Sequence, residues 1–425
     1  MTASLLLINA APGEIRAAWV EDGEVRDYRI EREARPSRVG DIHLGRVVQL
    51  LPALPAARVD IGGTSPAFLS QEDAIDLAPP EKRRQGIETY LHEGQSILVR
   101  IKRDAQDGKA IGLTARFEHT EPLLLAARQA TAPALIAGGL SALERLLQDA
   151  GEIGEIRIDD AAALAQARAF FARNPQAQNP QTPSPALTLH PRSGDIFEDH
   201  GVAPELDHVT AREVPIEGGG RLLFDRCAAM SVIDVDSGTE PGRGTASKAA
   251  LHLNLRAAAA IARQIRLRNL AGAIAIDFVS MRGHQDRAAV LKAFGEALAS
   301  DPIPVRLLGW TRLGHVELTR RRDRPALDDI LHERGPDGFQ RERAMTIALA
   351  CLRAAARAAD TESPPGNGPV VIRAAPEIVH TLTGEAASYL DALATRLQRR
   401  LLPTPDPARS RGSFAVEPHA KDQHS

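Results

Sequence analysis

The strongest constraint in this sequence is a long amphipathic segment that leads directly into an apolar run. From Ser247 to Arg268, apolar residues recur at spacings of three and four, which predicts a helix with one apolar stripe. Gly272 ends this helix, and the nearly unbroken apolar run 273–279 is typical of a buried strand flanked by helices. A predicted helix over 285–299 and a strand over 305–309 continue the alternation. The chain is therefore predicted to contain a large α/β unit.

A different sequence pattern precedes this unit. From about Gly40 to Phe117, short strand-like runs alternate with glycine and proline, the pattern of a small antiparallel barrel. Nearer the N-terminus, two alternating runs flank Asp22-Gly23, which predicts a hairpin. The length of 425 residues exceeds one compact core, so we expect two or three packed units.

Composition narrows the class of protein. Hydrophobic residues make up 43% and charged residues 25%, which excludes a mostly disordered or collagen-like chain. Two cysteines, Cys227 and Cys351, cannot build a disulfide framework or a four-cysteine zinc site. No stretch has the length of a membrane span, and no basic residue precedes the short apolar run 5–8 as a signal peptide requires. We expect a soluble cytoplasmic protein.

Two aspartates stand in apolar strand patterns. Asp234 lies in Ile-Asp-Val-Asp and Asp277 in Ile-Asp-Phe, where a lone ionised carboxylate carries a desolvation cost unless it is paired or bound to metal. If the two strands are neighbours, both carboxylates can share a hard cation such as Mg²⁺ and leave room for phosphate oxygens. The alternative is that these aspartates cap helices or pair with arginines.

Basic residues concentrate around the second aspartate. Between residues 254 and 324 there are thirteen Lys and Arg against six Asp and Glu, whereas the whole chain has a net charge of −3. A basic region around a metal site suits a polyanion, and Arg320 in the run 320–322 is a candidate clamp for a phosphate. A solvated helix face is the alternative for any one arginine.

Several segments together resemble one family. They are Gly40-Asp41-Ile42-His43-Leu44-Gly45-Arg46, Ile233-Asp234-Val235-Asp236-Ser237-Gly238, the run from Asn254-Leu255-Arg256 to Ile276-Asp277-Phe278, and Leu313-Gly314-His315-Val316-Glu317-Leu318-Thr319-Arg320. In this order they resemble the ribonuclease E/G family of bacterial endoribonucleases, over most of residues 5–330. The resemblance implies a multi-domain α/β chain in which a ribonuclease-H-like subdomain is interrupted by an OB-fold β-barrel and followed by a DNase-I-like subdomain. The implied bounds are 1–37 and 119–215 for the first, 38–118 for the barrel, 216–336 for the catalytic subdomain, and 337–425 for a helical region with a frayed tail.

The resemblance also implies an activity and its residues. Asp234 and Asp277 match the family's Mg²⁺ ligands, with Mn²⁺ as an alternative ion, for hydrolysis of single-stranded RNA. Phe68 matches a stacking aromatic and Lys109 an RNA-contacting lysine, and His43 is a further candidate contact. For these three the alternatives are barrel core for Phe68 and plain solvation for the other two.

Departures from the family pattern qualify this expectation. Asp236 replaces an asparagine and so adds negative charge beside the metal as an auxiliary carboxylate, and Arg58 replaces a second stacking phenylalanine. The segment that senses a substrate 5′-monophosphate is missing between residues 114 and 132, and the run 332–338 has no cysteines for the family's zinc link between protomers. We therefore expect no zinc-linked assembly, and a homodimer remains open. A catalytically inactive RNA-binding protein is the alternative function, and a nuclease acting on DNA is a more distant one.

Overall fold

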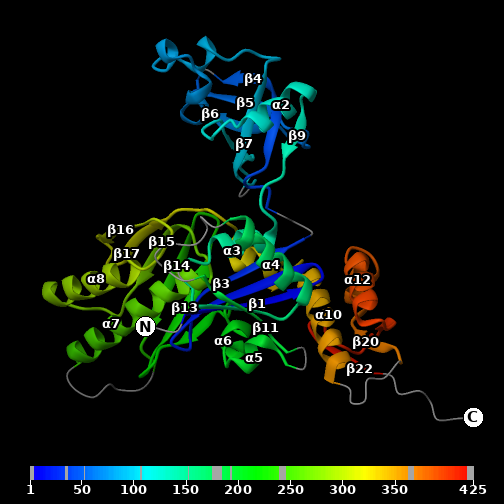
Figure 1. Cartoon of the computed structure of the whole chain (residues 1–425). Helices are drawn as coiled ribbons and strands as arrows, with labels where there is room; N and C mark the ends of the chain where they lie inside the picture. The colour runs from blue at the N-terminus through cyan, green and yellow to red at the C-terminus, as the bar shows by residue number, and fades with distance from the viewer. Residues whose placement is uncertain are drawn as a thin grey trace, which may run out of the picture. The chain divides into compact units, whose positions relative to one another are not determined.

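The computed structural model describes residues 4–33, 37–51, 53–105, 108–151, 153–174, 184–191, 194–238, 246–361 and 368–418. The chain forms two compact units (Figure 1). The barrel unit is residues 34–145, and the main unit combines residues 1–33 with 146–425. The barrel unit is thus inserted into the main unit. No helix in the described ranges is long and apolar enough to cross a membrane.

The barrel unit contains a closed sheet. Its strands follow the order β5-β6-β8-β7-β4-β9, and an additional β4–β5 pairing closes five of them into a barrel, which is consistent with an OB-like fold. Inward-facing Val59, Leu69 and Val99 belong to its core. The strands are β4 (Ile42–Leu51), β5 (Ala56–Asp60), β6 (Ala67–Ser70), β7 (Ser96–Arg103), β8 (Gly112–Thr114) and β9 (Ala134–Ala137). Helices α1 (Gln71–Ala74) and α2 (Glu121–Gln129) and 3₁₀ turns at Ile75–Leu77, Pro80–Lys82 and Ile87–Thr89 complete the unit, and α3 (Ala142–Gln148) follows at its boundary.

The first sheet of the main unit has the order β11-β10-β1-β2-β3. Strands β11, β10 and β1 run parallel, and β1, β2 and β3 form an antiparallel meander. Asp22 and Gly23 both have positive φ at the β2–β3 turn, which confirms the predicted hairpin. The elements are β1 (Ser4–Ala11), β2 (Glu14–Glu21), β3 (Glu24–Arg32), β10 (Glu155–Ile158), α4 (Ala161–Arg173), β11 (Ala186–Leu189), α5 (Ile196–Asp199) and α6 (Ala203–Asp207).

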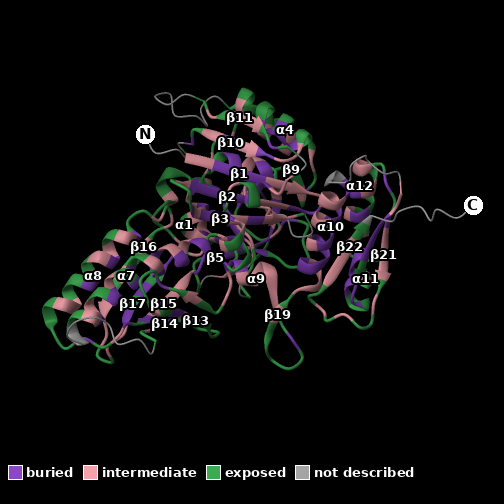
Figure 2. Ribbon diagram, turned by 90° about the horizontal axis from the view of Figure 1, so that it is seen from below, coloured by how far each residue is buried: buried purple, intermediate pink, exposed green. Residues whose placement is uncertain are grey.

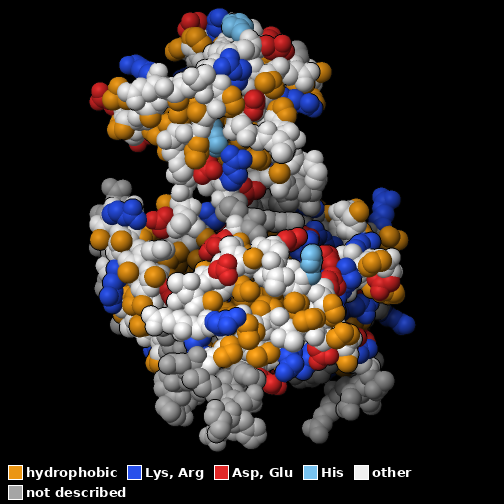
Figure 3. Space-filling view, turned by 90° about the vertical axis from the view of Figure 1, so that its right-hand side faces the viewer, with side chains coloured by type: hydrophobic (Ala, Val, Ile, Leu, Met, Phe, Trp, Pro, Cys, Tyr) orange, Lys and Arg blue, Asp and Glu red, His pale blue; other side chains and the backbone are white. Residues whose placement is uncertain are grey.

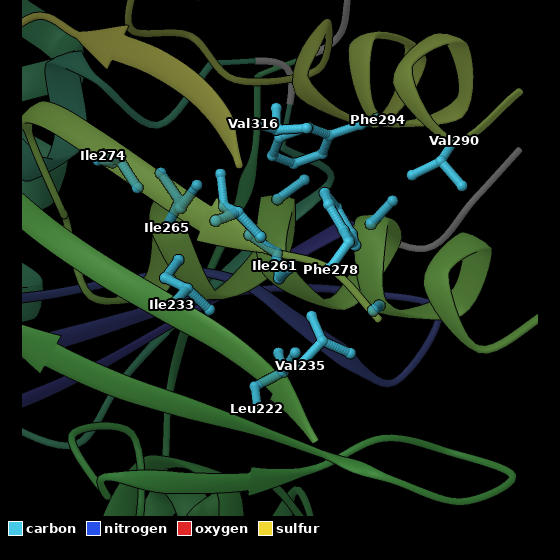
Figure 4. Packing of buried hydrophobic residues seen from close by; sticks show 14 of the residues in the cluster. Leu222, Ile233, Val235, Ile261, Ile265, Ile274, Phe278, Val290, Phe294 and Val316 are labelled. Atoms are coloured by element: carbon cyan, nitrogen blue, oxygen red, sulfur yellow. The ribbon is translucent and has the colours of Figure 1, made fainter. Parts of the chain in front are cut away.

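The second sheet carries the predicted α/β alternation. Its order is β12-β13-β14-β15-β17-β16, and β14 and β15 are its parallel pair within the described residues. The long helix α7 and helix α8 pack on it over the apolar cluster of Figure 4, which includes Ile233, Ile261 and Phe294. The elements are β12 (Glu213–Pro215), β13 (Arg221–Arg226), β14 (Met230–Asp236), α7 (Ala246–Leu267), β15 (Gly272–Asp277), α8 (His284–Leu298), β16 (Val305–Trp310) and β17 (Val316–Arg320).

Strand β15 differs from the expectation that both of its faces are buried. Ile274 and Ile276 are buried, whereas Ala273 and Ala275 on the opposite face are only half-buried. The apolar run looked continuous because alanine counts as apolar, although it tolerates partial exposure. Neighbours β14 and β17 also pair in opposite directions with β15, so this is a mixed sheet.

The C-terminal part has more strand than the sequence indicated. Where helices, one strand at 370–372 and a frayed tail were expected, a three-stranded sheet of order β21-β20-β22 packs with α10, α11 and α12 around a core of its own. The expected strand is β20, and residues 419–425 of the tail lie outside the described residues. Figure 2 shows buried residues on the inner face of α10 beside the first sheet. The elements are α9 (Leu327–Leu331), β18 (His332–Arg334), β19 (Gln340–Glu342), α10 (Ala344–Thr361), β20 (Val370–Ala374), α11 (Pro376–Thr383), α12 (Ala387–Leu397), β21 (Leu401–Pro405) and β22 (Phe414–Pro418).

Candidate functional site

The two predicted metal aspartates lie side by side. Asp234 on β14 and Asp277 on β15 are direct partners in the parallel register, both near the carboxyl ends of their strands. Adjacent strands are about 4.8 Å apart, so the two carboxyl groups can reach one cation. Asp277 is exposed and Asp234 is half-buried, which leaves the pair open to a solvent-borne substrate.

The electrostatics of this pair favour a cation. Burial, followed by the negative charges of Asp277 and Asp236, raises the pKa of Asp234. A divalent ion would relieve this repulsion, and carboxylate oxygens are the ligands that Mg²⁺ prefers. No group of three or more His, Cys, Asp or Glu in the described part of the chain is arranged to hold a metal by itself. A pair of carboxylates fits Mg²⁺, which binds through one or two carboxylates and keeps several waters.

A buried asparagine fixes the segment that follows Asp277. Asn254 on α7 is fully buried, its Nδ2 donates to the Val279 carbonyl at 2.8 Å, and its Oδ1 accepts from the Val279 amide at 3.1 Å. The Asn254 side chain thus satisfies both backbone hydrogen-bonding groups of Val279, as a neighbouring strand would. This role of Asn254 was not predicted from the sequence, although a polar residue within the apolar stripe of a helix indicates a buried hydrogen-bonding role.

A histidine also missed from sequence contacts the site. His315 lies just after the turn between β16 and β17, and its Nδ1 is 3.4 Å from Asp277 Oδ1. Both side chains are partly exposed. The imidazole can therefore hold the orientation of the Asp277 carboxyl group from the substrate side.

The structure changes the interpretation of Asp236. Arg221 Nε on β13 donates to Asp236 Oδ2 at 2.9 Å, and Arg221 Nη2 forms an ion pair with the same oxygen at 2.8 Å. The Gly238 amide donates to Oδ1, and this bond together with Arg221 lowers the pKa of Asp236. Arg221 also pairs with Glu213, so it holds the Asp236 carboxylate in place but offsets its negative charge only in part.

The expectation that Arg320 clamps a phosphate is wrong. Arg320 is 2% exposed, and its guanidinium donates to both oxygens of Asp301 at 2.7 and 3.1 Å. It also donates to Asn269 Oδ1 and to the Leu270 carbonyl. With these acceptors in place and no exposed surface, the side chain cannot reach a substrate. The basic run suggested equivalent arginines, but burial alternates along β17. Arg320 therefore lies on its buried face, whereas Arg321 is exposed.

On the barrel unit, the predicted RNA contacts Phe68 and Arg58 are cross-strand neighbours. Phe68 on β6 is half-buried between the core residues Ala67 and Leu69, so its ring lies outside the barrel core. It pairs with Arg58 of β5 on one side and with Gly112 of β8 on the other. Arg103 of β7 pairs with Gly112, so the row places one ring between two guanidinium groups. Such a row suits base stacking and phosphate contact.

The other two barrel candidates differ from each other. Lys109 is exposed between β7 and β8, which fits both an RNA contact and plain solvation, so its role stays a prediction. His43 is 2% exposed on β4, and its Nε2 accepts from Arg38 Nη2 at 3.0 Å. The expectation that His43 touches RNA is therefore wrong, because the ring is enclosed by its own barrel.

His43 makes the barrel unit sensitive to acid. Burial and the Arg38 charge lower the pKa of His43 below its unfolded value of about 6.5. The unfolded chain therefore binds more protons between the two pKa values, so stability is full above about pH 6.5 and is lost as pH falls toward the folded pKa. Amide-exchange protection of β4, corrected for intrinsic rates, should fall between pH 7.5 and 5.5. The same loss in His43→Gln would contradict this cause.

The chain is also similar in sequence to a family of known proteins. The model of the Ribonuclease E/G family matches residues 81–323, which is more than half of the chain. The chain belongs to the ribonuclease E/G family. The matched region includes Asp234, Asp236 and Asp277 but not Arg58 or Phe68.

Individual relatives cover most of the chain. Ribonuclease G of Escherichia coli K12 is 26% identical over 468 residues, covering 92% of this chain and 94% of that protein. Ribonuclease G of Haemophilus influenzae is 28% identical and covers 83% of this chain and 86% of that protein. Ribonuclease E of Escherichia coli K12 is 26% identical over 77% of this chain but only 38% of that protein. The chain thus resembles ribonuclease G along nearly its whole length.

The segment where the ribonuclease E/G resemblance places a zinc link forms a hairpin. Strands β18 and β19 pair antiparallel there, with His332 opposite Glu342. The chain's cysteines lie elsewhere, with Cys227 exposed and Cys351 buried. That this family member forms no zinc link stays a prediction.

Proposed function

We propose that this chain hydrolyses phosphodiester bonds in single-stranded RNA, with Mg²⁺ held by Asp234 and Asp277 and Mn²⁺ as an alternative ion. Family membership and the ribonuclease relatives make it an endoribonuclease. The observation that carries the assignment of the site is the parallel register that sets the two aspartates side by side.

The residues around the pair have separate tasks in this proposal. Asp234 and Asp277 bind the ion, which supplies an activated water and withdraws charge from the scissile phosphate. Asn254 positions the chain after Asp277 through Val279, and His315 orients the Asp277 carboxyl group. Arg221 keeps Asp236 deprotonated and oriented beside the site.

We further propose that the subdomains correspond to those of the family. The sheet of β1, β2, β3, β10 and β11 would be the ribonuclease-H-like subdomain, and the sheet of β12 to β17 the DNase-I-like one (216–336). Residues 119–145, expected to return to the ribonuclease-H-like subdomain, belong instead to the barrel unit, where β9 pairs with β4. The barrel, expected at 38–118, would be the OB-fold that binds RNA, and its closed sheet supports this. Whether the chain acts as a homodimer is open to measurement by sedimentation.

The barrel row yields a binding prediction. Phe68→Ala should weaken binding of a short single-stranded RNA about tenfold or more, because a stacked base contributes about 1–3 kcal/mol. Arg84→Ala is the matched control, since Arg84 is exposed on the same unit and lies outside the row. Fluorescence anisotropy at one fixed salt concentration measures both. Equal affinities for the two variants would remove Phe68 from the interface.

The activity itself is tested by a Mg²⁺ titration of cleavage on a short single-stranded RNA. Product should rise with Mg²⁺ and disappear in Asp234→Asn. Because the sensor segment is missing from the sequence, RNA with a 5′-monophosphate or a 5′-hydroxyl should be cut at rates within about threefold of each other, a difference of less than one charge-assisted hydrogen bond. RNA binding without any Mg²⁺-stimulated product would instead support the inactive RNA-binding protein. A DNA strand of the same sequence tests the nuclease acting on DNA.

A further inference from the structure

A polar cavity lies in the main unit away from Asp234 and Asp277. It opens at the carboxyl ends of the adjacent parallel strands β1 and β10, where Asn9 and Asp159 line it. Helices α10 and α12 supply the other wall through Arg353, Arg357 and Arg396. Its empty space, open solvent included, is about 440 Å³. Carboxyl ends of parallel strands are the usual place for ligands in α/β sheets.

The acceptor groups of this cavity are already used by the protein. Both oxygens of Asp159 accept hydrogen bonds, from the Asn9 amide group and from the Ala10 backbone N–H. Asn9 Oδ1 accepts from Arg16 Nε at 2.9 Å. Asp195 caps helix α5 with one oxygen and accepts from Arg357 with the other. The lining therefore offers few free acceptors to a ligand.

Several arginine N–H donors at the cavity, in contrast, make no hydrogen bond within the described residues. Arg353 donates from Nη1 to Glu14, and its Nε and Nη2 make no hydrogen bond within the described residues. Arg396 donates from Nη1 to Asp160 at 3.0 Å and to the Ala10 carbonyl at 3.4 Å, and its Nη2 makes no hydrogen bond within the described residues. Two arginines thus present spare N–H groups at one cavity.

The charges that line the cavity also favour an anionic ligand. The cavity lining holds three arginines against two aspartates. Burial, followed by the neighbouring Arg16 charge, lowers the pKa of Arg353 to about 10 even though Glu14 pairs with it, so a bound anion would offset part of the cost of burying this charge. Figure 3 shows acidic and basic side chains intermixed over one face of the molecule.

We propose that this cavity binds the phosphate group of a small ligand, with Arg353 and Arg396 as the donors to its oxygens. A phosphate offers several acceptor oxygens and no need for free acceptors on the protein, and arginine is the side chain best suited to bind it. Arg357 lines the same wall. The site is independent of the proposed cleavage chemistry, because none of its residues belongs to the sheet of Asp234 and Asp277.

Isothermal titration of the full chain tests this site. Inorganic phosphate, ribose 5-phosphate and adenosine 5′-monophosphate serve as separate probes, in buffer with a chelator and no divalent metal, so that the aspartate pair does not contribute. Phosphate binding alone would identify a free-ion site. Tighter binding of one of the two esters would show that the ligand carries the group on a sugar or on a nucleoside.

Three variants make the test specific. Ala356→Leu fills the cavity without changing charge, and Arg396→Gln removes one donor. Each should weaken binding of the best probe about tenfold or more, as expected for a lost charged hydrogen bond. Ala354→Leu, on the same helix but outside the cavity lining, should bind like wild type. Thermal unfolding confirms that each variant folds.

Two outcomes would overturn the proposal. One is that wild type binds none of the probes at millimolar concentration. The other is that folded Ala356→Leu and Arg396→Gln both bind as tightly as Ala354→Leu, which would place the measured binding on another basic surface of the chain.

Discussion

Asp277→Asn should reduce RNA cleavage by about a thousandfold or more, because a metal site contributes several kcal/mol of charge stabilisation in the transition state. Asp277 is about half exposed and makes one close contact with His315, so the fold should survive the change. Binding of RNA to the barrel unit should also be unchanged. Cleavage rates at saturating Mg²⁺, with circular dichroism and RNA anisotropy on the same samples, measure all three effects.

Asp225→Asn is the matched control for that experiment. Asp225 lies on β13 of the same sheet and pairs on the surface with Arg212, so its substitution makes the same charge change. We expect its cleavage rate to stay near that of wild type. If Asp277→Asn cuts as fast as this control, the metal site is not at the end of β15.

The second large effect is on folding. Arg320→Met should cost about 3–5 kcal/mol of unfolding free energy, because it leaves Asp301 charged and buried without its partner. Urea unfolding monitored on the main unit measures this loss. Arg321→Ala, at the exposed residue that directly follows β17, should change the unfolding free energy by less than about 0.5 kcal/mol.

A double variant separates the structural role of Arg320 from a role in binding. Arg320→Met combined with Asp301→Leu removes both charges, and apolar replacement of a buried pair is often neutral or stabilising, so much of the lost stability should return. A role of Arg320 in holding phosphate predicts the opposite pattern. In that case the single variant would unfold normally and lose RNA affinity, and the double variant would not regain it.

The local pattern of the sequence predicted the elements of the second sheet well. The helix expected at 247–268 is α7 at Ala246–Leu267, and the strand before Asp236 is β14. The adjacency of Asp234 and Asp277 depended on which strands are neighbours, and the parallel register of β14 and β15 meets that condition. Short-range periodicity was sufficient here because each element buries one continuous apolar face.

Long-range pairings could not be predicted in the same way. Arg320 pairs with Asp301, 19 residues earlier, and Arg221 pairs with Asp236 on the opposite strand of a hairpin. The burial of His43 depends on the pairing of β4 with both β7 and β9. The arginines of a basic run cannot be told apart until it is known which face of the strand each side chain occupies. The C-terminal strands β21 and β22 were missed for another reason, since both contain proline and pair only with β20.

The insertion of the barrel has a consequence for engineering. The chain leaves the main unit after Glu33 and returns at Leu146, and Arg29 and Asp149, a few residues outside these points, form an ion pair at 2.5 Å. The two cut ends are thus held close together by the main unit itself. A short glycine and serine bridge between them can replace the whole barrel at little entropic cost. The barrel unit can therefore be removed without breaking the main unit, and another small domain could be inserted at the same position.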